Sequence, residues 1–484
     1  MTNVDHREQL PTEKGPAQAG ASTRGVASVI AVLAVSALIM ILNETVLSVV
    51  LPQLMEDFRV AATTAQWLTT GFMLTMAVVI PTTGFLLQRF TTRTLFTAAL
   101  VLFIAGTALA AVASGFAVML LARVIQACGT AIILPLLMTT TLTTVPVACR
   151  GTVMGLNSVV ISVAPAIGPT VSGLVAESLG WRWVFGLMLV VSLVAFLIGV
   201  VFIRVANETR RAPLDVLSVV LSAFGFGGLV YGLASVGAVV EGAWAPVLAL
   251  VVGVVALVLF AVRQRNLQRN DAALLDLRPF AVHNFRVSLA IVVVCMATML
   301  GTVVVLPIYL QNGLGVSILT TGLLLLPGGL VQGVLSPVIG RVYDRVGPRP
   351  LVIPGALLLC GGQWWLSTVG ADTGPGTVVA MHVVFCVGMA MLMTPLMTLS
   401  LSSLPRRLYS HGSAIMNTLQ QLAGAAGTAL LIAAMSIGAA TAAGSFGPAQ
   451  AQALGTQDAF VIGGCLGVVA VLCAPFVRRL RADA

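Results

Sequence analysis

Apolar runs of about twenty residues recur along the whole sequence, and they commit this chain to a membrane. Each run is long enough to cross a hydrocarbon core of roughly 30 Å as an α-helix. Only 8% of the residues are charged, against roughly 25% in a soluble domain, so the chain cannot cover a water-facing surface. Solid runs rather than alternating dyads argue against a β-barrel. The predicted fold class is an all-α polytopic membrane protein.

Fourteen such runs are present, joined by short connections. They lie at about 26–51, 65–87, 94–113, 117–144, 152–176, 183–203, 214–234, 244–262, 286–310, 319–339, 350–369, 376–403, 416–438 and 459–477. With the N-terminus in the cytoplasm, 22 of the 25 Lys and Arg residues fall in the tail and loops on that side. Arg59 and Arg182 fall on the other side, and Arg123 lies inside the fourth run. Because basic residues gather in cytoplasmic loops, we expect fourteen spans in the plasma (inner) membrane with both termini cytoplasmic.

The remaining composition narrows the class of protein. The formal charge of +9 follows from those arginine-containing loops, so no nucleic-acid partner is expected. The seven cysteines show no CxxC spacing, and neither a disulfide framework nor a metal site is predicted. No phosphate-binding G-x-x-x-x-G-K-[ST] loop occurs, so we expect no cofactor and an ion gradient as the energy source. Residues 1–24 are polar and are predicted to form a disordered cytoplasmic tail.

An internal repeat divides the chain into two halves. GFLLQRFTTR (84–93) follows the second run and GRVYDRVGPR (340–349) follows the tenth, with Gly, Arg and Arg in the same register. Parallel repeats of six helices are a known transporter architecture. The predicted domains are an N-terminal six-helix bundle (25–205), two inserted helices (206–264), and a connector with a C-terminal six-helix bundle (265–484).

Several short motifs lie on the corresponding spans of one transporter family. The second loop copy carries Gly340, Asp344, Arg345, Gly347 and Arg349; the first keeps Gly84, Arg89 and Arg93 but has Gln88 and Thr91. Span 4 carries Arg123, Gln126, Ala127 and Gly129. Span 5 carries Pro165, Gly168, Pro169, Ser172 and Gly173. Span 1 carries Leu42, Asn43, Thr45, Ser48 and Pro52. Together they resemble the major facilitator superfamily, specifically its fourteen-helix drug:proton antiporters.

The resemblance covers nearly the whole chain after residue 25. It implies two six-helix bundles around one ligand site, alternating access by rocking, and drug export. It also gives Arg123 a role in proton transfer. The sequence departs from the pattern at Asn43, where the family has an aspartate, and an acid reappears at Glu44. Some relatives with a similar span-1 pattern are associated with lincosamide resistance.

Glu44 is the predicted proton-coupling carboxyl. An acid near a helix centre costs roughly 2.5–3.5 kcal/mol to insert, so such residues usually face the bundle interior or an aqueous cavity. Helical spacing aligns it with Ser36, Met40 and Ser48, which predicts that this polar stripe of span 1 faces a central cavity. A carboxyl there can bind a proton on one side and release it on the other, in competition with a cationic drug. The alternative is a purely structural acid near the outer headgroups.

Arg123 is the only basic residue inside a span. It is predicted to pair with Glu44 or with a helix carbonyl, and so to tune proton release. The alternative is a structural hydrogen-bond anchor between span 4 and its neighbours.

A gating role is predicted for two groups of residues. The loop copies are Gly84, Arg89 and Arg93, and Gly340, Asp344, Arg345 and Arg349, whose glycines permit close helix approach and whose Asp-Arg elements clamp one bundle on the other. The span-5 group is Pro165, Gly168, Pro169 and Gly173. Its prolines allow the helix to kink, and its glycines allow another helix to approach closely. Positive-inside topology and ordinary tight packing are the alternatives.

Polar and soft residues elsewhere are candidates for a substrate cavity: Asn43, Ser48, Trp67, Thr70, Gln126, Asn157, Tyr309, Gln311, His382, Met389, Met393, Asn417, Gln420 and Gln421. Methionine adapts its shape to varied apolar ligands, although ordinary helix packing is the more frequent role.

The predicted function is proton-coupled efflux of lipophilic neutral or monocationic drugs by a protein that is not an enzyme. Its partners are then small-molecule drugs, protons and the lipid bilayer, and a monomer is expected. A narrow exporter of one antibiotic or metabolite is the alternative, followed by a non-transporting receptor and a membrane enzyme. The sequence leaves open coupling to Na⁺ instead of protons.

Overall fold

The computed structural model describes residues 23–203, 215–235, 243–270 and 272–479. Within these ranges it holds fourteen helices of eighteen or more residues and no strand, which confirms the predicted all-α class. Thirteen helices are long and apolar enough to cross a membrane by length and composition. The other, α13 (Arg349–Leu366), begins with arginine and includes Gln363 and two tryptophans, which lower its mean hydropathy. The architecture is therefore consistent with fourteen spans.

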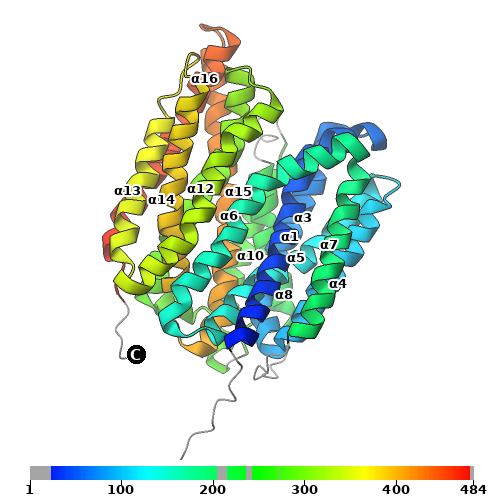
Figure 1. Cartoon of the computed structure of the whole chain (residues 1–484), viewed down its shortest axis with the longest axis vertical. Helices are drawn as coiled ribbons and strands as arrows, with labels where there is room; N and C mark the ends of the chain where they lie inside the picture. The colour runs from blue at the N-terminus through cyan, green and yellow to red at the C-terminus, as the bar shows by residue number, and fades with distance from the viewer. Residues whose placement is uncertain (1–22, 204–214, 236–242, 271, 480–484) are drawn as a thin grey trace, which may run out of the picture.

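Two bundles of six helices stand side by side, as Figure 1 shows. The first bundle consists of α1 (Thr23–Phe58), α3 (Trp67–Arg89), α4 (Thr92–Ala111), α5 (Phe116–Thr144), α6 (Arg150–Leu179) and α7 (Trp181–Phe202), with a short α2 (Ala62–Ala65). The second bundle consists of α11 (His283–Ile308), α12 (Ile318–Val346), α13, α14 (Pro375–Ser402), α15 (Tyr409–Ala442) and α16 (Pro448–Cys473).

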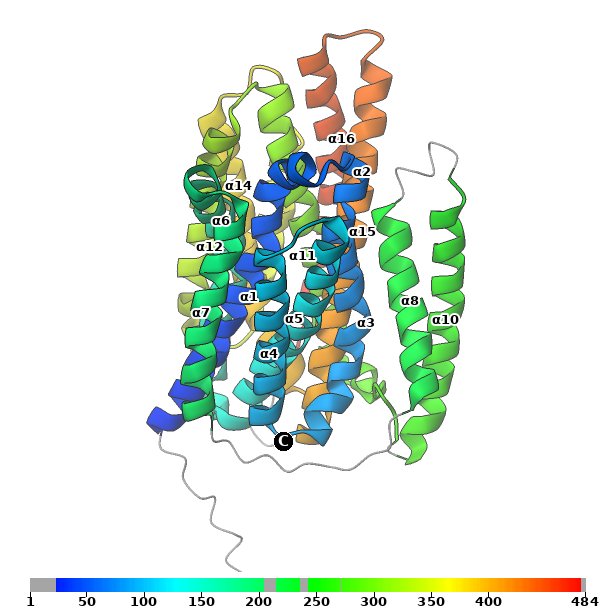
Figure 2. The same cartoon turned by 90° about the vertical axis from the view of Figure 1, so that its right-hand side faces the viewer.

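The two inserted helices, α8 (Val216–Ala234) and α10 (Ala245–Leu267), form a separate pair that we call the insert. Figure 2 shows the insert at the edge of the molecule, beside α3. Helix α8 packs on α3 and α15, and α10 packs on α8. The domain boundary predicted at residue 205 lies outside the described residues.

Glycine conformation separates the two copies of the repeated loop. Gly347 ends α12 with a φ of +83°, a backbone region that only glycine adopts readily. Thr91, at the same register position, has a φ of −70° and accepts a hydrogen bond from the Thr94 amide as the N-cap of α4. The first copy therefore lacks this glycine because its loop does not need one.

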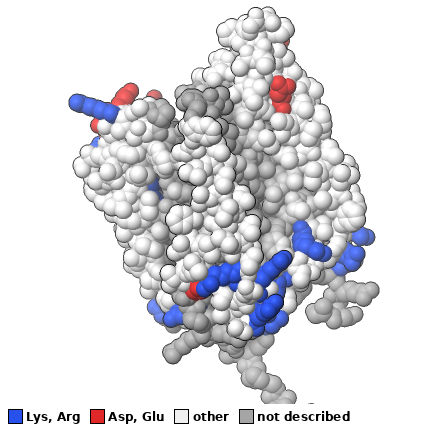
Figure 3. Space-filling view, turned by 180° about the vertical axis from the view of Figure 1, so that it is seen from behind, with Lys and Arg blue, Asp and Glu red and all other residues white. Residues whose placement is uncertain are grey.

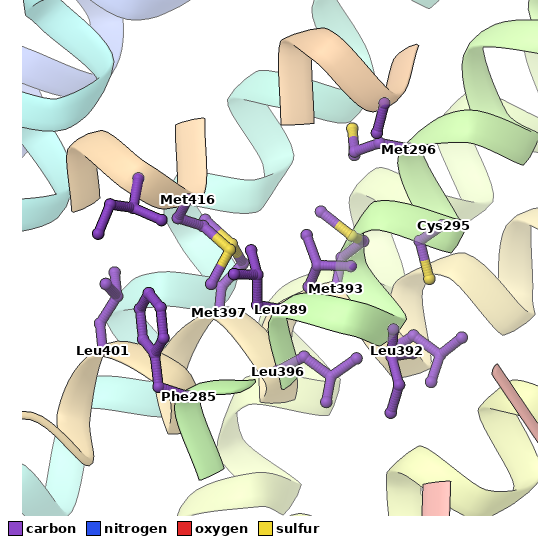
Figure 4. Packing of buried hydrophobic residues seen from close by; sticks show 14 of the residues in the cluster. Phe285, Leu289, Cys295, Met296, Leu392, Met393, Leu396, Met397, Leu401 and Met416 are labelled. Atoms are coloured by element: carbon purple, nitrogen blue, oxygen red, sulfur yellow. The ribbon is translucent and has the colours of Figure 1, made fainter. Parts of the chain in front are cut away.

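A methionine-rich core fills the space between α11, α14 and α15. Figure 4 shows Met393 and Met397 lying beside Leu289 and Met416. The thioether side chains fill an irregular space between three helices, as methionine does in protein cores.

Most of the arginines lie at one end of the molecule, where α1 begins and α16 ends (Figures 1 and 3). We call it the arginine-rich end, defined by Arg89, Arg150, Arg341, Arg345 and Arg406. The other end is called the opposite end.

Candidate functional site

Glu44 lies near the middle of α1 and is partly buried. Its carboxylate forms no hydrogen bond and no ion pair within 4.0 Å with any residue that the structure describes. Arg123 is close enough to interact with it electrostatically. A carboxylate without fixed partners in this position is free to exchange a proton with water that reaches it.

Arg123 is fully buried and is held by its neighbours rather than by Glu44. Its Nη1 donates to Asn43 Oδ1 at 2.8 Å, to the Asn43 carbonyl oxygen at 3.4 Å and to Gln126 Oε1 at 3.0 Å. Gln126 Nε2 in turn donates to Thr107 Oγ1 at 3.0 Å. The guanidinium also lies over the Phe72 ring, 4.1 Å from its centroid. Of the two partners that the sequence left open, the structure shows the helix carbonyl.

This network leaves donors unused. Arg123 Nε and Nη2 are buried without a hydrogen-bond partner among the described residues, and so is Asn43 Nδ2. Leaving a buried donor unsatisfied costs roughly 1–3 kcal/mol, more for a charged group. An acceptor that approached this site would therefore be bound favourably, and Glu44 is the next residue along α1.

The predicted polar stripe of α1 does not line a cavity along its full length. Ser36 and Met40 are fully buried, and Met40 belongs to a cluster with α4, α5 and α7 inside the first bundle. Ser36 Oγ donates to the carbonyl of Val32, so its hydroxyl is satisfied by its own helix. The stripe prediction was wrong for these two residues, because a serine bonded in this way needs no aqueous surface. The side chain of Ser48 lies outside the described residues.

Most predicted cavity residues are buried in this conformation. The buried set is Asn43, Gln126, Asn157, Tyr309, His382, Met389, Met393 and Asn417. Asn157 donates to Thr141 Oγ1 at 3.0 Å, and Tyr309 donates to the Gly370 carbonyl oxygen at 2.6 Å. Asn157 and Tyr309 thus bond within their own bundles, whereas Met389 and Met393 belong to a hydrophobic cluster with residues of both bundles.

Five of the candidates are more exposed. Thr70, Gln311, Gln420 and Gln421 are partly buried. Trp67 is exposed and stacks on Tyr231 of α8 with ring centroids 5.6 Å apart, so it joins α3 to the insert.

At the arginine-rich end, Asp344 of α12 bridges the two bundles. Its carboxylate accepts from the amides of Gly151 and Thr152 at 2.8 Å each, and from Thr152 Oγ1 at 2.7 Å. These amides belong to the first turn of α6, where backbone donors lack helical partners and the helix dipole favours negative charge. A Cβ on Gly340 would overlap the Gly151 carbonyl oxygen, so glycine is what permits this approach.

The repeat-related contact lies between α3 and α15. Gln88 Nε2 donates to Ser410 Oγ and to the Arg407 carbonyl oxygen, both at 3.3 Å. A Cβ on Gly84 would lie 2.9 Å from His411 Nδ1. The loop copies thus hold equivalent places against the starts of α15 and α6, with a neutral amide in one and a carboxylate in the other.

Arg150 forms a third link between the bundles, which the sequence did not predict. Its Nη1 donates to Tyr409 Oη of α15 at 3.2 Å. Its Nε and Nη2 donate to the carbonyl oxygens of Val145 and Leu142, so the side chain is buried and fixed. A loop arginine of this kind is indistinguishable in sequence from a topology signal.

The arginines of the predicted clamp act differently from the expectation. Arg93 donates to the Val200 carbonyl oxygen of α7 at 3.1 Å, and Arg349 donates to that of Val477 at 2.8 Å. Each therefore ties helices within its own bundle. Arg89 and Arg345 are exposed, and Arg89 lies 5.8 Å from the centroid of the Phe85 ring. The bundles are joined by Asp344, Gln88, Arg150 and the loop glycines, whereas Arg93 and Arg349 bond within their own bundles.

The span-5 glycines and prolines lie within α6. Gly168 lies against Thr45 of α1, inside the first bundle, and Gly173 is partly buried. The helix runs through Pro165 and Pro169, whose side chains lie outside the described residues. The close approaches of α6 to α12 come instead from Gly151 and from Gly155, where a Cβ would lie 2.5 Å from the Ser336 carbonyl oxygen.

A chain of hydrogen bonds connects the insert to the start of α15. Asp215 binds Arg263 at 2.7 and 2.8 Å and accepts from Ser218 Oγ. Gln264 donates to Ser218 and accepts from the Leu275 amide at 3.2 Å. The next amide, of Asp276, donates to His411 Nδ1 at 3.3 Å, close to Gly84.

The hydrogen bonds that join the two bundles among the described residues lie between the arginine-rich end and about the middle of the helices. Of these bonds, the contact of Gln421 Nε2 with Met76 Sδ lies farthest from the arginine-rich end, and Gly333 of α12 also approaches Val163 of α6. Within the described ranges no hydrogen bond or ion pair joins the bundles beyond these points. Hydrogen bonds between the bundles therefore close the arginine-rich end.

The predicted spans also left one acid, Asp458, outside the membrane helices. Helix α16 begins at Pro448, earlier than the predicted span at 459, so Asp458 lies inside a membrane-length helix and is exposed. Gly447 followed by Pro448 is a typical helix start and could have indicated this.

Comparison with known proteins agrees with this architecture. The family model described as Major Facilitator Superfamily matches residues 33–216 and 214–428. The Lincomycin resistance protein LmrB of Bacillus subtilis (strain 168) is 39% identical over 451 residues, which cover 91% of this chain and 93% of that protein. The Tetracenomycin C resistance and export protein of Streptomyces glaucescens is 28% identical, over 89% of this chain and 79% of that protein.

Two solved structures share the fold. The proton:xylose symporter XylE has a TM-score of 0.68 at 17% identity, covering 94% of this chain and 97% of its own. The human organic anion transporter MFSD10 has a TM-score of 0.67 at 15% identity, covering 93% and 99%. The chain is a multi-pass membrane transporter and not an enzyme, and it belongs to the major facilitator superfamily.

Proposed function

We propose that this transporter exports lipophilic neutral or monocationic drugs across the plasma membrane in exchange for protons. The observation that carries the proposal is Glu44, a partly buried carboxylate near the middle of the apolar helix α1, without hydrogen-bond partners among the described residues. Relatives named for lincomycin resistance and for tetracenomycin export support a drug as cargo.

The arginine-rich end is assigned to the cytoplasm, because basic residues gather in cytoplasmic loops. Both chain termini then lie in the cytoplasm. The structure, closed at that end, then corresponds to a conformation that faces outward. The chain contains both bundles, so a monomer suffices. The predicted boundary at 264/265 falls inside α10, which ends at Leu267.

Coupling then follows from the position of Glu44. In the outward-facing conformation, Glu44 takes a proton from outside. After the bundles rock, it loses this proton to the cytoplasm, and its negative charge attracts a cationic drug. The unused Nε and Nη2 donors of Arg123 would stabilise the ionised carboxylate, so proton and drug compete for one group. One carboxylate suits a neutral or monocationic ligand, and the Gln420/Gln421 pair on α15 supplies neutral polar contacts.

The test is proton movement in inverted membrane vesicles with an acidified lumen. We expect lipophilic cations to collapse the pH gradient with the wild type and to leave it intact with Glu44→Gln. Asp458→Asn is the matched control, since it removes an acid from a helix of the other bundle and should behave like the wild type. Gradient collapse by Glu44→Gln would refute the coupling role. Replacement of the pH response by a Na⁺-dependent response would assign the coupling ion as Na⁺.

A narrow exporter of one antibiotic is the second candidate. It is favoured by 39–40% identity to several proteins named for lincomycin resistance, over more than 90% of this chain. Uptake of lincomycin alone among a panel of unrelated drugs would select it. Ligand binding without any transport would favour a receptor instead.

A further inference from the structure

The segment between the insert and the second bundle borders an open cavity that the proposed transport cycle does not use. It lies at the arginine-rich end, where α10 ends and the connector turns toward α11. Its volume is about 380 Å³. It is lined by Arg265, Gln268, Leu277, Arg278, Phe280 and Ala281.

Two kinds of surface meet in this cavity. Leu277, Phe280 and Ala281 supply an apolar wall, and Arg265 and Gln268 supply cationic and polar groups. The cavity adjoins α10, which exposes a long series of valines and leucines, including Val255 and Leu259. Such a helix face is covered by acyl chains in a membrane. A ligand with a polar head and an apolar body would therefore match both surfaces.

The charges point to a monoanionic head. Asp276 forms an ion pair with Arg278 and so balances its charge, with Arg278 Nη2 at 2.5 Å from Asp276 Oδ2. Arg265 is exposed and has no hydrogen bond or ion pair to another described residue. Gln268 accepts from the Leu277 amide at 3.3 Å through Oε1, which leaves its NH₂ group as a donor. Among the described residues, the lining has one uncompensated positive charge and no acid to receive an ammonium group.

We propose that this cavity binds the phosphodiester head of an anionic phospholipid such as phosphatidylglycerol. Basic pockets beside membrane helices on the cytoplasmic side bind such heads. A free phosphate shares the phosphate chemistry, but it does not use the apolar wall or the neighbouring α10 surface. Zwitterionic lipids would leave their ammonium group without an acidic partner here.

A lipid head in this position would join α10 to the connector. The connector reaches the closed end through the Asp276 amide and His411, so the bound lipid would favour closure there. The assignment of this end to the cytoplasm rests on the proposed function, whereas the cavity does not.

The test is lipid retention by the purified full chain, measured by native mass spectrometry after exchange into phosphatidylglycerol or phosphatidylcholine. We expect selective retention of phosphatidylglycerol, about fivefold weaker in Arg265→Gln. Arg269→Gln is the matched control, since it removes the same charge from an exposed residue of the same segment outside the cavity. Ala281→Trp fills the cavity without a change of charge and should weaken retention as well.

Three results would overturn the proposal. They are equal losses in Arg265→Gln and Arg269→Gln, no effect of Ala281→Trp, and equal retention of the two lipids. Displacement of the lipid by millimolar inorganic phosphate would assign the site to free phosphate instead. None of these measurements needs transport, so they fail or succeed independently of Glu44.

Discussion

The two repeat-related contacts at the arginine-rich end hold the bundles together by different means. Asp344 places a carboxylate on the amides of α6, whereas Gln88 places a neutral amide beside the start of α15. The Gln88 side is additionally backed by the connector and the insert through Asp276 and His411. A charged group thus closes the interface between α12 and α6. Neutral hydrogen bonds close the interface between α3 and α15, where the connector also contacts α15. The same backbone arrangement can be stabilised in either way.

The largest expected effect comes from removal of the charged contact. Asp344→Ala deletes three charge-assisted hydrogen bonds and should weaken closure by about 2–3 kcal/mol. Spin labels at the exposed Val147 and Val346 should report a wider distance distribution across this end. Gln88→Ala, the matched deletion on the other side, should change it far less. Equal effects of the two deletions would show that the charge is irrelevant.

The glycines provide the second comparison. Gly340→Ala would place a methyl group against the backbone oxygen of Gly151, whereas Gly84→Ala meets a histidine side chain at 2.9 Å. A side chain can move aside, but helix backbone cannot, so Gly340→Ala should cost about 1–3 kcal/mol and Gly84→Ala less. Thermal unfolding in detergent measures the difference. A larger loss for Gly84→Ala would reverse the ranking of the two interfaces.

A gain is expected when the neutral contact is made charged. Gln88→Asp places a carboxylate near the first turn of α15, where the helix dipole favours it by up to about 1 kcal/mol. The same spin-label pair should show a narrower distribution, and drug-stimulated proton movement should slow because opening becomes rarer. A wider distribution would mean that the two helix starts are not equivalent.

The smallest effect concerns pH and the insert. The Arg263 guanidinium holds the pKa of Asp215 at about 2, below its ordinary 3.8. A depressed pKa contributes stability that is present above pH 3.8 and is lost as pH falls toward 2. The pair should therefore leave the unfolding temperature unchanged between pH 5 and 8. Asp215→Asn compared with the wild type checks this, and a pH-dependent difference in that range would contradict it.

The helices, and the relation of the two loop copies as a repeat, were predictable from the sequence. The residues that these loops contact were not. Run length and arginine placement determine which segments cross the membrane, and both are local in sequence. The contact of Asp344 with Gly151 spans 193 positions, and its donors include backbone amides that no side-chain pattern reveals. The prediction that Ser36 faces a cavity was wrong because its partner is also a backbone group. Its hydroxyl bonds to a carbonyl of its own helix, whereas the sequence shows only that the side chain is polar. Glu44 was found because an isolated acid in an apolar run is conspicuous; its coupling role stays a prediction.

The partners of Asp344 also determine how this contact can change over generations. Two of its three acceptor bonds end on main-chain amides, which every residue except proline supplies. Substitutions at Gly151 or Thr152 can crowd the contact but rarely remove those donors. The contact therefore depends on the identity of one residue: a mutation of the Asp344 codon alone can abolish it. A second mutation that restores closure has to arise elsewhere in the molecule.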